Sequence, residues 1–410
     1  MSQALAAAEA ASRTPHSHAG DQTGWRFYRA GQQPSWSDPA RRDEVCADLA
    51  GRPVLARLPD LLRLRGELAC VAAGDGLVLQ AGDCAESFAE CTPEHTAHKE
   101  RALTRLGDAL AVTTGLPAVR IGRLAGQFAK PRSAPTEDVD GRPLPVFRGH
   151  IVNSELPDAG SRRHDPDRML RAYRAARTVA ESLTRPQGPN RALGQRTWIS
   201  HEALVMDYEA ALVRFDESTG GWFLGSTHLP WIGERTRHSE GAHVRLLADV
   251  LNPVACKVSG TASARDLLDV VERLDPAREP GRLTLIARFG KDKVRAQLPA
   301  LAQAVKNAGH PVVWLCDPMH GNTYKAANGL KTRRLDDVVD EIRGFVTALQ
   351  SVGVRPGGLH LETAAVDVTE CVGADVPDEE ALTARYTSLC DPRLNPVQAA
   401  LAVDSFVSAL

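Results

Sequence analysis

The stretch from residue 311 to residue 323 joins an apolar run to a cluster of groups that can do chemistry. Its first half contains Val312-Val-Trp-Leu315, which is apolar and has the length of a strand. Its second half carries Cys316, Asp317, His320, Asn322 and Thr323. A short apolar run followed at once by titratable groups is typical of a buried parallel strand that presents reactive side chains at its carboxyl end.

The same pattern recurs along the chain, and its recurrence predicts the architecture. Strand-like runs occupy residues 77–83, 118–124, 197–201, 222–231, 253–259, 283–289, 312–316 and 358–362. The strand ends carry, in order, Cys84, Arg123, His201, Glu234 with Arg235, Lys257, Arg288, His320 and Glu362. Because the active sites of (β/α)8 barrels lie at the carboxyl ends of the strands, we expect these side chains to share one mouth.

Four of these ends are basic, namely Arg123, Arg235, Lys257 and Arg288. A guanidinium group matches a carboxylate or a phosphate, so several cations together indicate a ligand with more than one negative charge. The loop Lys130-Pro-Arg-Ser133 adds two cations and a hydroxyl group on a segment stiffened by proline. Any one of these arginines is equally well explained as a surface charge, but their convergence favours anion binding.

A second set of side chains has the chemistry of metal ligands. Cys84, His320 and Glu362 end strands one, seven and eight, which are neighbours in a closed barrel, and Asp391 follows in a later loop. A thiolate, an imidazole and carboxylates suit a divalent transition ion. Their spacing along the chain is too wide for a local metal motif, and a lone buried cysteine is more often a small apolar residue. Spacing alone therefore leaves both interpretations open.

Amphipathic helices separate most of the strand-like runs, with apolar residues at helical spacing in segments 267–274, 294–305 and 335–349. Strand and helix alternating eight times predict an α/β fold, a (β/α)8 TIM barrel over residues 76–410. A helical N-terminal extension over residues 21–75 and a disordered tail over residues 1–20 would precede it. A doubly wound sheet is disfavoured by the lack of a glycine-rich dinucleotide motif after the first strand.

The composition limits the classes of partner. The chain has 410 residues, 43% of them hydrophobic, and its 49 basic and 51 acidic residues give a net charge of -2. Nothing in this balance predicts nucleic acid as a partner, and no apolar stretch reaches the roughly 18 residues of a membrane helix. The eight cysteines are scattered without a CxxC motif, which favours reduced thiols and a cytoplasmic location.

The motifs that contain these residues resemble those of type II 3-deoxy-D-arabino-heptulosonate 7-phosphate (DAHP) synthases, transferases that catalyse the first step of the shikimate pathway. The resemblance runs in the family's order from roughly residue 25 to the end of the chain. The matching motifs are Gln80-Ala-Gly-Asp-Cys-Ala-Glu-Ser-Phe88, Arg123-Leu-Ala-Gly-Gln-Phe-Ala-Lys-Pro-Arg-Ser133, Ser200-His-Glu-Ala203, Trp231-Ile-Gly-Glu-Arg-Thr-Arg237, Cys316-Asp-Pro-Met-His-Gly-Asn-Thr323, Gly329-Leu-Lys-Thr-Arg333, His360-Leu-Glu362 and Cys390-Asp-Pro-Arg-Leu-Asn395.

The resemblance implies that phosphoenolpyruvate condenses with erythrose 4-phosphate and inorganic phosphate is released. It implies metal ligands at Cys84, His320, Glu362 and Asp391, for Mn2+ or Co2+ first and for Mg2+ or Zn2+ as further candidates. It implies a phosphoenolpyruvate site made of Arg123, Glu234, Arg235, Lys257 and Arg288. It implies contacts to erythrose 4-phosphate from Lys130, Arg132, Ser133 and Lys331. The catalytic side chains would be Glu234, Lys257 and Lys130, with Glu234 beside Lys257 to orient or deprotonate the water that adds to the enol-phosphate carbon.

The chain departs from the family pattern between the second and fourth strands. Family members that serve primary metabolism carry an inserted helical pair there, which binds aromatic amino acids together with the N-terminal part. Here only residues 184–191 separate a helix predicted near 167–183 from the next strand. The resemblance therefore implies a short form similar to secondary-metabolism members. Such a form would not be feedback-inhibited, and it would assemble as a homodimer or a higher homo-oligomer.

Other hypotheses remain open at the level of sequence. Lys257 ends an apolar strand, and a desolvated lysine can form an imine, so a Schiff-base aldolase on the same barrel is one alternative. A homologue that accepts an amino or imino sugar phosphate is another. Cys390 adjoins Asp391, which predicts that its thiol lies near Cys84. Oxidation of that pair to a disulfide would block metal binding.

Overall fold

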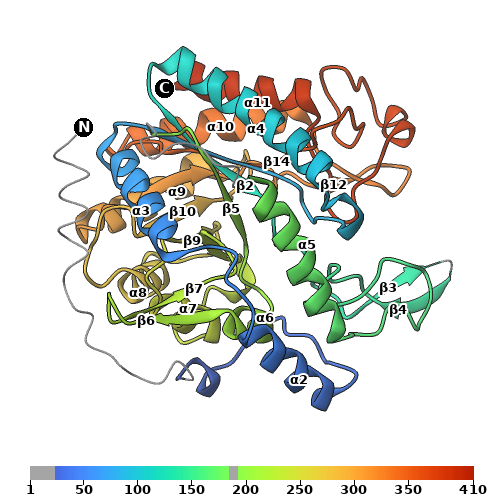
Figure 1. The fold of residues 1–410 in the computed structure, drawn as a ribbon. Coiled ribbons are helices and arrows are strands. Elements are labelled where there is room, and N and C mark those ends of the chain that lie inside the picture. Colours follow the sequence, from blue (N-terminus) through green and yellow to red (C-terminus); the bar gives the residue numbers. More distant parts are fainter. Residues whose placement is uncertain (1–23, 140, 184–192) are drawn as a thin grey trace.

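The computed structural model describes residues 24–139, 141–183 and 193–410, and the predicted tail over residues 1–20 lies outside them. A closed barrel of eight parallel strands forms the centre of the molecule (Figure 1). In barrel order the strands are β1 (Leu77–Gly82), β14 (Gly358–Glu362), β11 (Val313–Cys316), β10 (Leu283–Ala287), β9 (Val254–Val258), β8 (Leu229–Ile232), β5 (Thr197–Glu202) and β2 (Ala118–Arg123). The predicted (β/α)8 class is confirmed, and strands one, eight and seven are adjacent as predicted.

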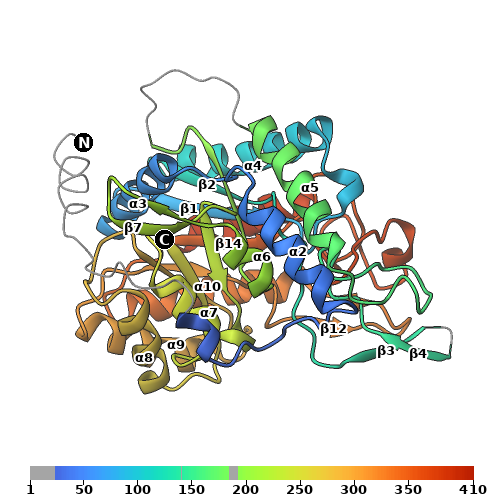
Figure 2. The ribbon, with the colours of Figure 1, turned by 60° about the horizontal axis from the view of Figure 1, so that its bottom comes forward.

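Helices cover the outside of the barrel. They are α4 (Pro93–Thr114), α5 (Asp167–Leu183), α6 (Met206–Ala211), α7 (Ala242–Ala248), α8 (Ala264–Leu274), α9 (Val294–Asn307), α10 (Leu335–Gln350) and α11 (Pro396–Ala409). Among the described residues, the α-helices α2 (Pro39–Ala50) and α3 (Leu58–Ala73) precede the barrel. Helix α2 packs against α5 and α6, and α3 lies across the amino-terminal end of the strands (Figure 2). Leu64 and Leu68 of α3 join the apolar residues inside the barrel, so this helix closes its lower end.

Shorter elements decorate the loops. Three antiparallel hairpins are formed by β3 (Thr136–Val139) with β4 (Arg142–Pro145), β6 (Val213–Asp216) with β7 (Gly221–Leu224), and β12 (Tyr324–Lys325) with β13 (Lys331–Thr332). The short 3-10 helices are η1 (Gly24–Phe27), η2 (Phe88–Glu90), η3 (Glu234–Thr236) and η4 (Ala381–Ala384). The β3–β4 hairpin projects away from the barrel in both views (Figures 1 and 2).

Side chains alternate between the inside and the outside of the barrel with the period of two that a strand imposes. Val78, Ile121, Trp198, Ile286 and Leu315 fill the inside, whereas their chain neighbours pack against the surrounding helices. Towards the carboxyl ends, the inward positions change from apolar to polar. The same alternation places Arg123, Lys257, Arg288 and Glu362 on the inner side, which is why four separate strands supply one site.

Two expectations about strands were wrong. Residues 222–231 are not one strand, because β7 ends at Leu224 and β8 of the barrel begins at Leu229. Between them the chain turns at Gly225, where a Cβ atom would lie 2.4 Å from Val54 Cγ1. The third strand ends on Glu202 rather than on His201. The His201 ring points outward and its Nε2 lies 2.9 Å from Glu209 Oε1, whereas Glu202 lines the cavity described below.

Candidate active site

A cavity of about 240 Å³ opens at the carboxyl ends of the strands. Seven basic side chains line it, together with His320 and the carboxylates of Glu202, Glu234 and Asp391. Eleven of the predicted site residues lie in its wall: Arg123, Lys130, Arg132, Ser133, Glu234, Arg235, Lys257, Arg288, His320, Lys331 and Asp391. The excess of cations makes the cavity suitable for small ligands that carry several negative charges.

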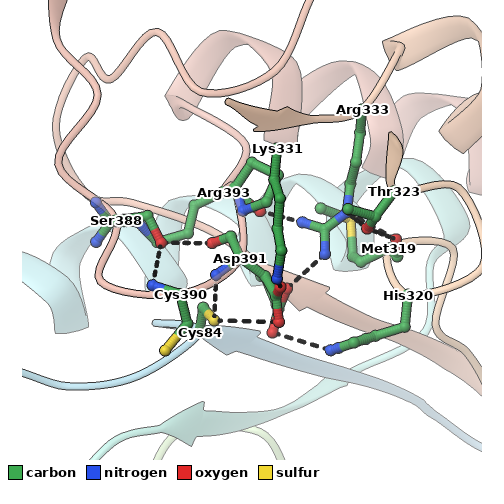
Figure 3. Close-up of polar contacts among 12 residues, drawn as sticks. Cys84, Met319, His320, Thr323, Lys331, Arg333, Ser388, Cys390, Asp391 and Arg393 are labelled. Carbon is green, nitrogen blue, oxygen red and sulfur yellow. Dashed lines mark hydrogen bonds and ion pairs between the residues drawn. The ribbon is translucent and has the colours of Figure 1, made fainter. Parts of the chain in front are cut away.

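A group of metal-type ligands adjoins this cavity (Figure 3). One ligand atom from each of Cys84, Glu362 and Asp391 lies within 4.8 Å of the others, and Cys84 Sγ is 3.8 Å from Asp391 Oδ2. His320 is next to this group, with its Nε2 3.2 Å from Glu362 Oε1. The four predicted ligands therefore lie together, although three of them form the compact set.

His320 is oriented by the carboxylate of Asp317. The Nδ1 atom of His320 lies 2.8 Å from Asp317 Oδ2, which leaves Nε2 directed at Glu362. A carboxylate that accepts the Nδ1 proton is the usual arrangement behind a metal-binding histidine, because it fixes the tautomer and the ring. Asp317 also lies 2.9 Å from Lys257 Nζ. Burial alone would oppose its ionisation, but His320 and Lys257 hold the pKa of this carboxyl well below its usual range.

Cations surround Glu362, which is fully buried. Its Oε1 atom lies 3.0 Å from Arg123 Nη2 and 3.5 Å from Lys130 Nζ, and its Oε2 atom lies 2.8 Å from Arg333 Nη2. Burial opposes ionisation here too, but His320, Lys130 and Arg333 hold the pKa of Glu362 well below its usual range. The site thus presents a carboxylate that stays charged at neutral pH.

Two lysines flank Asp391 in a similar way. Lys130 Nζ lies 3.2 Å from Asp391 Oδ2, and Lys331 Nζ lies 2.8 Å from Asp391 Oδ1. Burial favours a neutral amine at Lys130, but Cys84 and the two neighbouring carboxylates raise its pKa well above the usual value. Lys130 therefore keeps its proton beside the ligand group.

Cys84 and Cys390 lie close together (Figure 3). The backbone N–H of Asp391 donates a hydrogen bond to Cys84 Sγ at 3.1 Å, which holds the loop carrying Cys390 against the end of β1. Burial, followed by the contact with Cys390, raises the pKa of the Cys84 thiol, whereas the contact with Cys84 lowers the pKa of Cys390. Both cysteines are free thiols.

Glu234 and Lys257 both line the cavity, but each has other direct partners. The Oε1 atom of Glu234 accepts hydrogen bonds from Arg237 at 2.9 Å and from Ser259 at 3.0 Å. Its Oε2 atom is buried and has no hydrogen-bond partner among the described residues. Lys257 is held by Asp317, so the expected placement of Glu234 beside Lys257 is not a direct contact.

The predicted loop for the sugar phosphate is held from both sides. Ser133 Oγ accepts a hydrogen bond from Arg235 Nη2 at 2.8 Å, so the two predicted subsites meet at this pair. Arg132 Nη2 lies 3.0 Å from Glu137 Oε2, and the backbone N–H of Arg132 donates to Gln32 Oε1 at 2.9 Å. The β3–β4 hairpin and the chain before α2 thus fix this loop.

Several residues of the site were missed in the sequence. Trp231 lies in the cavity wall, 5.1 Å from the guanidinium carbon of Arg123 and 6.0 Å from Lys257 Nζ. Asp317 and Arg333 hold predicted site residues in place. Both stand inside the quoted motifs, beside residues that were assigned, and strand alternation would have placed Asp317 on the inner side. The charged partners of Asp317 and Arg333 are brought to them by closure of the barrel, so the local sequence does not reveal them.

The fold and the geometry define a (β/α)8 barrel with a basic cavity next to a group of metal-type ligands. A model of the class-II DAHP synthetase family matches residues 20–189 and 183–407. The chain belongs to this family, and as a DAHP synthase it is a transferase.

Curated relatives cover nearly the whole chain. A probable phospho-2-dehydro-3-deoxyheptonate aldolase of Pseudomonas fluorescens is 50% identical over 374 residues, 91% of this chain and 93% of the relative. A phospho-2-dehydro-3-deoxyheptonate aldolase of Streptomyces coelicolor is 40% identical over 421 residues, 91% of this chain and 94% of the relative. A solved phospho-2-dehydro-3-deoxyheptonate aldolase of Francisella tularensis matches with a TM-score of 0.53 at 13% identity, over 89% of this chain and 92% of that chain, which supports the fold alone. None of the helices described here is long and apolar enough to cross a membrane.

Proposed function

We propose that this protein condenses phosphoenolpyruvate with erythrose 4-phosphate in a metal-dependent reaction that yields DAHP and inorganic phosphate. The main support for this proposal is the cavity itself. Seven basic side chains line it, and it adjoins the metal-type ligands Cys84, Glu362 and Asp391. Two phosphate groups and a carboxylate repel one another strongly, and a ring of cations offsets that repulsion while holding the reactants in contact. Family membership supports the reaction, and the charge of the cavity supports the substrates.

The ligand group fits a divalent transition ion. Cys84 offers a sulfur, and His320 offers Nε2 because Asp317 engages its Nδ1. Glu362 and Asp391 offer charged oxygens. Mixed sulfur, nitrogen and oxygen ligands favour Mn2+, Co2+ or Zn2+ over Mg2+, which prefers oxygen alone. We assign Mn2+ or Co2+ as the working ion. Such an ion supplies a Lewis acid for the aldehyde oxygen.

Each protein group then has a defined task. Arg123, Arg235 and Arg288 bind the anionic groups of phosphoenolpyruvate, and Arg132 with Ser133 and Lys331 binds the phosphate of the sugar. The enol carbon bonds to the aldehyde carbon, and the aldehyde oxygen takes a proton to become a hydroxyl group. Lys130 is the donor for that proton, because it keeps its charge beside Glu362 and Asp391.

Water completes the reaction at the former enol-phosphate carbon. It adds to that carbon and passes one proton to a base. As the carbon–oxygen bond to phosphate breaks, the new hydroxyl group becomes the keto group and its proton leaves with the inorganic phosphate. The Oε2 atom of Glu234 is the candidate base, since it is buried at the cavity without a described partner, whereas Oε1 is already engaged. Lys257, held by Asp317, stabilises the negative charge of the departing phosphate.

Lack of feedback inhibition is part of this proposal. The two parts of the family match meet at residues 183–189, where the sequence predicted a missing helical pair. The alignment with the Streptomyces coelicolor relative runs over 421 positions, whereas 91% of 410 residues is about 373, so about 48 positions have no counterpart here. The Pseudomonas fluorescens alignment covers the same share of this chain in 374 positions. We assign this chain to the short form, which the resemblance links to secondary metabolism, and propose a homodimer.

The test follows phosphoenolpyruvate by its ultraviolet absorbance in the presence of erythrose 4-phosphate. Protein stripped with EDTA should be inactive, and addition of Mn2+ or Co2+ should restore the loss of absorbance. A C84S variant should require a higher metal concentration than the wild type. Loss of absorbance that persists in EDTA would contradict the role of the metal. No loss of absorbance with Mn2+, Co2+, Mg2+ or Zn2+ would contradict the proposed substrates.

One observation favours the Schiff-base alternative. Burial lowers the pKa of Lys257, which would assist an amine nucleophile, although the neighbouring Asp317 opposes this effect. Borohydride treatment with each substrate distinguishes the two chemistries. The proposed reaction predicts no covalent adduct on Lys257 by mass spectrometry, and a trapped adduct would favour the imine.

A further inference from the structure

A chain of buried polar side chains crosses the inside of the barrel below the cavity. His360 on β14 and Gln80 on β1 are directly opposite in the strand register. Their side chains join, with His360 Nδ1 2.7 Å from Gln80 Oε1. Gln80 Nε2 donates to Ser200 Oγ at 3.0 Å, and Ser200 Oγ donates to the backbone oxygen of Gly122 at 2.9 Å. Four neighbouring strands, β14, β1, β2 and β5, are linked in this way.

Such a chain of hydrogen-bonded side chains is unusual inside a barrel, where apolar side chains could fill the same space. Gln80, Ser200 and His360 are fully buried, and the layer below them is apolar. Buried polar groups are unfavourable unless they are hydrogen-bonded, and even then an apolar layer packs as well. The upper end of the chain shows what it supports, because the other nitrogen of His360, Nε2, lies 2.6 Å from Arg123 Nη1.

The hydrogen-bond partners at the two ends determine one tautomer of His360. Arginine has only donors, so Nε2 of His360 must be the acceptor and carry no proton. The remaining ring proton is then on Nδ1, where Gln80 Oε1 accepts it. The amide of Gln80 is oriented in turn by Ser200, whose hydroxyl is committed to Gly122. The chain therefore ends at a backbone carbonyl group, and every member has one assignment that satisfies all its partners.

The same contacts leave Arg123 with very little freedom. Its Nε donates to the backbone oxygen of Asp83 at 2.9 Å, and its Nη2 donates to Glu362 at 3.0 Å and to the backbone oxygen of Cys84 at 3.4 Å. One N–H of Nη1 goes to His360. Of the five N–H groups of a guanidinium, only the second N–H of Nη1 has no partner among the described residues, and Arg123 lines the cavity.

We propose that His360 is a positioning residue for phosphoenolpyruvate binding, which fixes Arg123 so that a single Nη1 N–H faces the ligand. Gln80 and Ser200 support it by fixing its tautomer. Gly82 makes the arrangement sterically feasible, since it lies between Arg123 and Glu362 in the register and a Cβ there would approach the Arg123 backbone to 3.0 Å. This inference rests on the proposed function, which assigns Arg123 to phosphoenolpyruvate.

The experiment compares H360L, H360Q and Q80L with the wild type in steady-state kinetics at saturating metal. H360L and Q80L should raise the KM for phosphoenolpyruvate by about tenfold, the range expected for loss of a hydrogen bond to a charged group. H360Q should stay within about threefold, because a glutamine can accept from Arg123 and donate to Gln80. The KM for erythrose 4-phosphate and the metal requirement should change by less than twofold. The H360L/Q80L double variant should be no worse than H360L, because both changes disrupt one chain.

His228 provides the matched control. It is also a buried histidine of the barrel, but its Nδ1 accepts a hydrogen bond from the backbone N–H of Ile199 and it does not line the cavity. H228Q should lower the melting temperature without raising the KM for phosphoenolpyruvate. An unchanged KM in H360L, or an equal rise in H228Q at an equal loss of stability, would overturn the proposal.

A second readout does not need activity. The 15N spectrum of histidine-labelled wild type should contain one resonance pair, absent from H360Q, with a protonated Nδ1 and an unprotonated Nε2. The opposite tautomer would overturn the proposal. An inactive wild type that still shows the Nδ1–H tautomer would instead contradict the proposed function and leave the geometry of Arg123 in place.

Discussion

Glu362 is the side chain on which most charges of the site converge. Arg123, Lys130 and Arg333 all contact it, and it is as buried as an apolar core residue. A buried carboxylate is tolerable only while its charge is compensated, because the loss of a partner leaves an unsolvated charge. The local electrostatics therefore depend on Arg333, which contacts the Oε2 atom of Glu362 and does not line the cavity.

We predict that R333L lowers the free energy of unfolding by about 3–5 kcal/mol, the usual effect of breaking a buried ion pair. Arg333 also donates to the backbone oxygen of Met319 at 2.7 Å, so the loop that carries His320 should loosen and metal affinity should fall. Urea denaturation and a metal titration measure the two effects. The neighbouring Arg334 is the control, since it is exposed and pairs with Glu379, and R334L should change stability by less than about 1 kcal/mol. Equal effects of the two substitutions would contradict the prediction.

At the scale of elements, helix α10 holds two active-site loops through one carboxylate. Glu341 Oε1 accepts the backbone N–H groups of Phe289 and Gly290 at 2.8 Å each, and Oε2 accepts Asn322 Nδ2 at 2.7 Å. These loops carry Arg288 and His320. Burial raises the pKa of Glu341 from 4.5 to about 7, although the backbone hydrogen bonds oppose the shift.

This shift predicts a pH dependence of stability. The folded protein binds the Glu341 proton more tightly than the unfolded chain does, so its contribution is fully present below pH 4.5 and is lost as the pH rises to about 7. As the pH rises from 4.5 to about 7, the unfolding free energy of the wild type should therefore fall by roughly 1–3 kcal/mol relative to that of E341Q. Burial also raises the pKa of Asp275, to about 6, so Asp275 also makes the protein less stable as the pH rises. Because the wild type and E341Q both contain Asp275, its effect cancels in the difference between them. A flat difference between pH 4.5 and 7.5 would contradict the assignment.

The loop before α11 brings a second thiol to the end of β1. Because Cys390 contacts Cys84, we predict that air oxidation of metal-free protein links the two and abolishes metal binding. Peptide mapping by mass spectrometry should find the linked pair, and reduction should restore binding. C390A should bind metal and resist inactivation by air, whereas C371A should behave like the wild type because Cys371 is buried against Arg393. Absence of the linked peptide would remove the hypothesis.

The sequence predicted elements better than it predicted contacts. Apolar runs that end in polar residues located all eight strand regions, because a buried parallel strand must be apolar until it reaches the mouth. The merged run over residues 222–231 failed because β7 and β8 are both apolar and the turn at Gly225 carries no proline to mark it. The sequence analysis ended the third strand at His201, whereas the strand runs to Glu202 and its alternation directs Glu202 to the inner side. Partners such as Asp317 and Arg333 required the closed barrel, since they meet groups 60 and 29 residues away.

At the scale of the whole molecule, closure of the sheet makes the site. Strands β1, β14 and β11 come from opposite ends of the sequence, yet they are consecutive in the barrel. Cys84 and His320 follow β1 and β11, and Glu362 is the last residue of β14, so one small region receives ligands from residues 84 to 362. The described strands close the barrel by themselves, so we expect the chemistry not to require the inserted helical pair that the resemblance attributes to primary-metabolism members.

We therefore expect catalysis not to depend on the inserted helical pair, whereas regulation by aromatic amino acids should depend on it. We predict that phenylalanine, tyrosine and tryptophan, alone or together at 1 mM, leave the rate of phosphoenolpyruvate consumption unchanged within about 10%, because the proposed short form would have no amino-acid site and hence no coupling free energy to transmit. The Streptomyces coelicolor relative, whose alignment contains about 48 further positions, is the comparison in the same assay, and inhibition of that relative alone would support the prediction. Inhibition of this chain at submillimolar concentration would show that aromatic amino acids bind elsewhere on the barrel. Direct calorimetry with each amino acid separates the two cases, since lack of a site predicts no heat of binding, whereas a site without coupling predicts binding without inhibition.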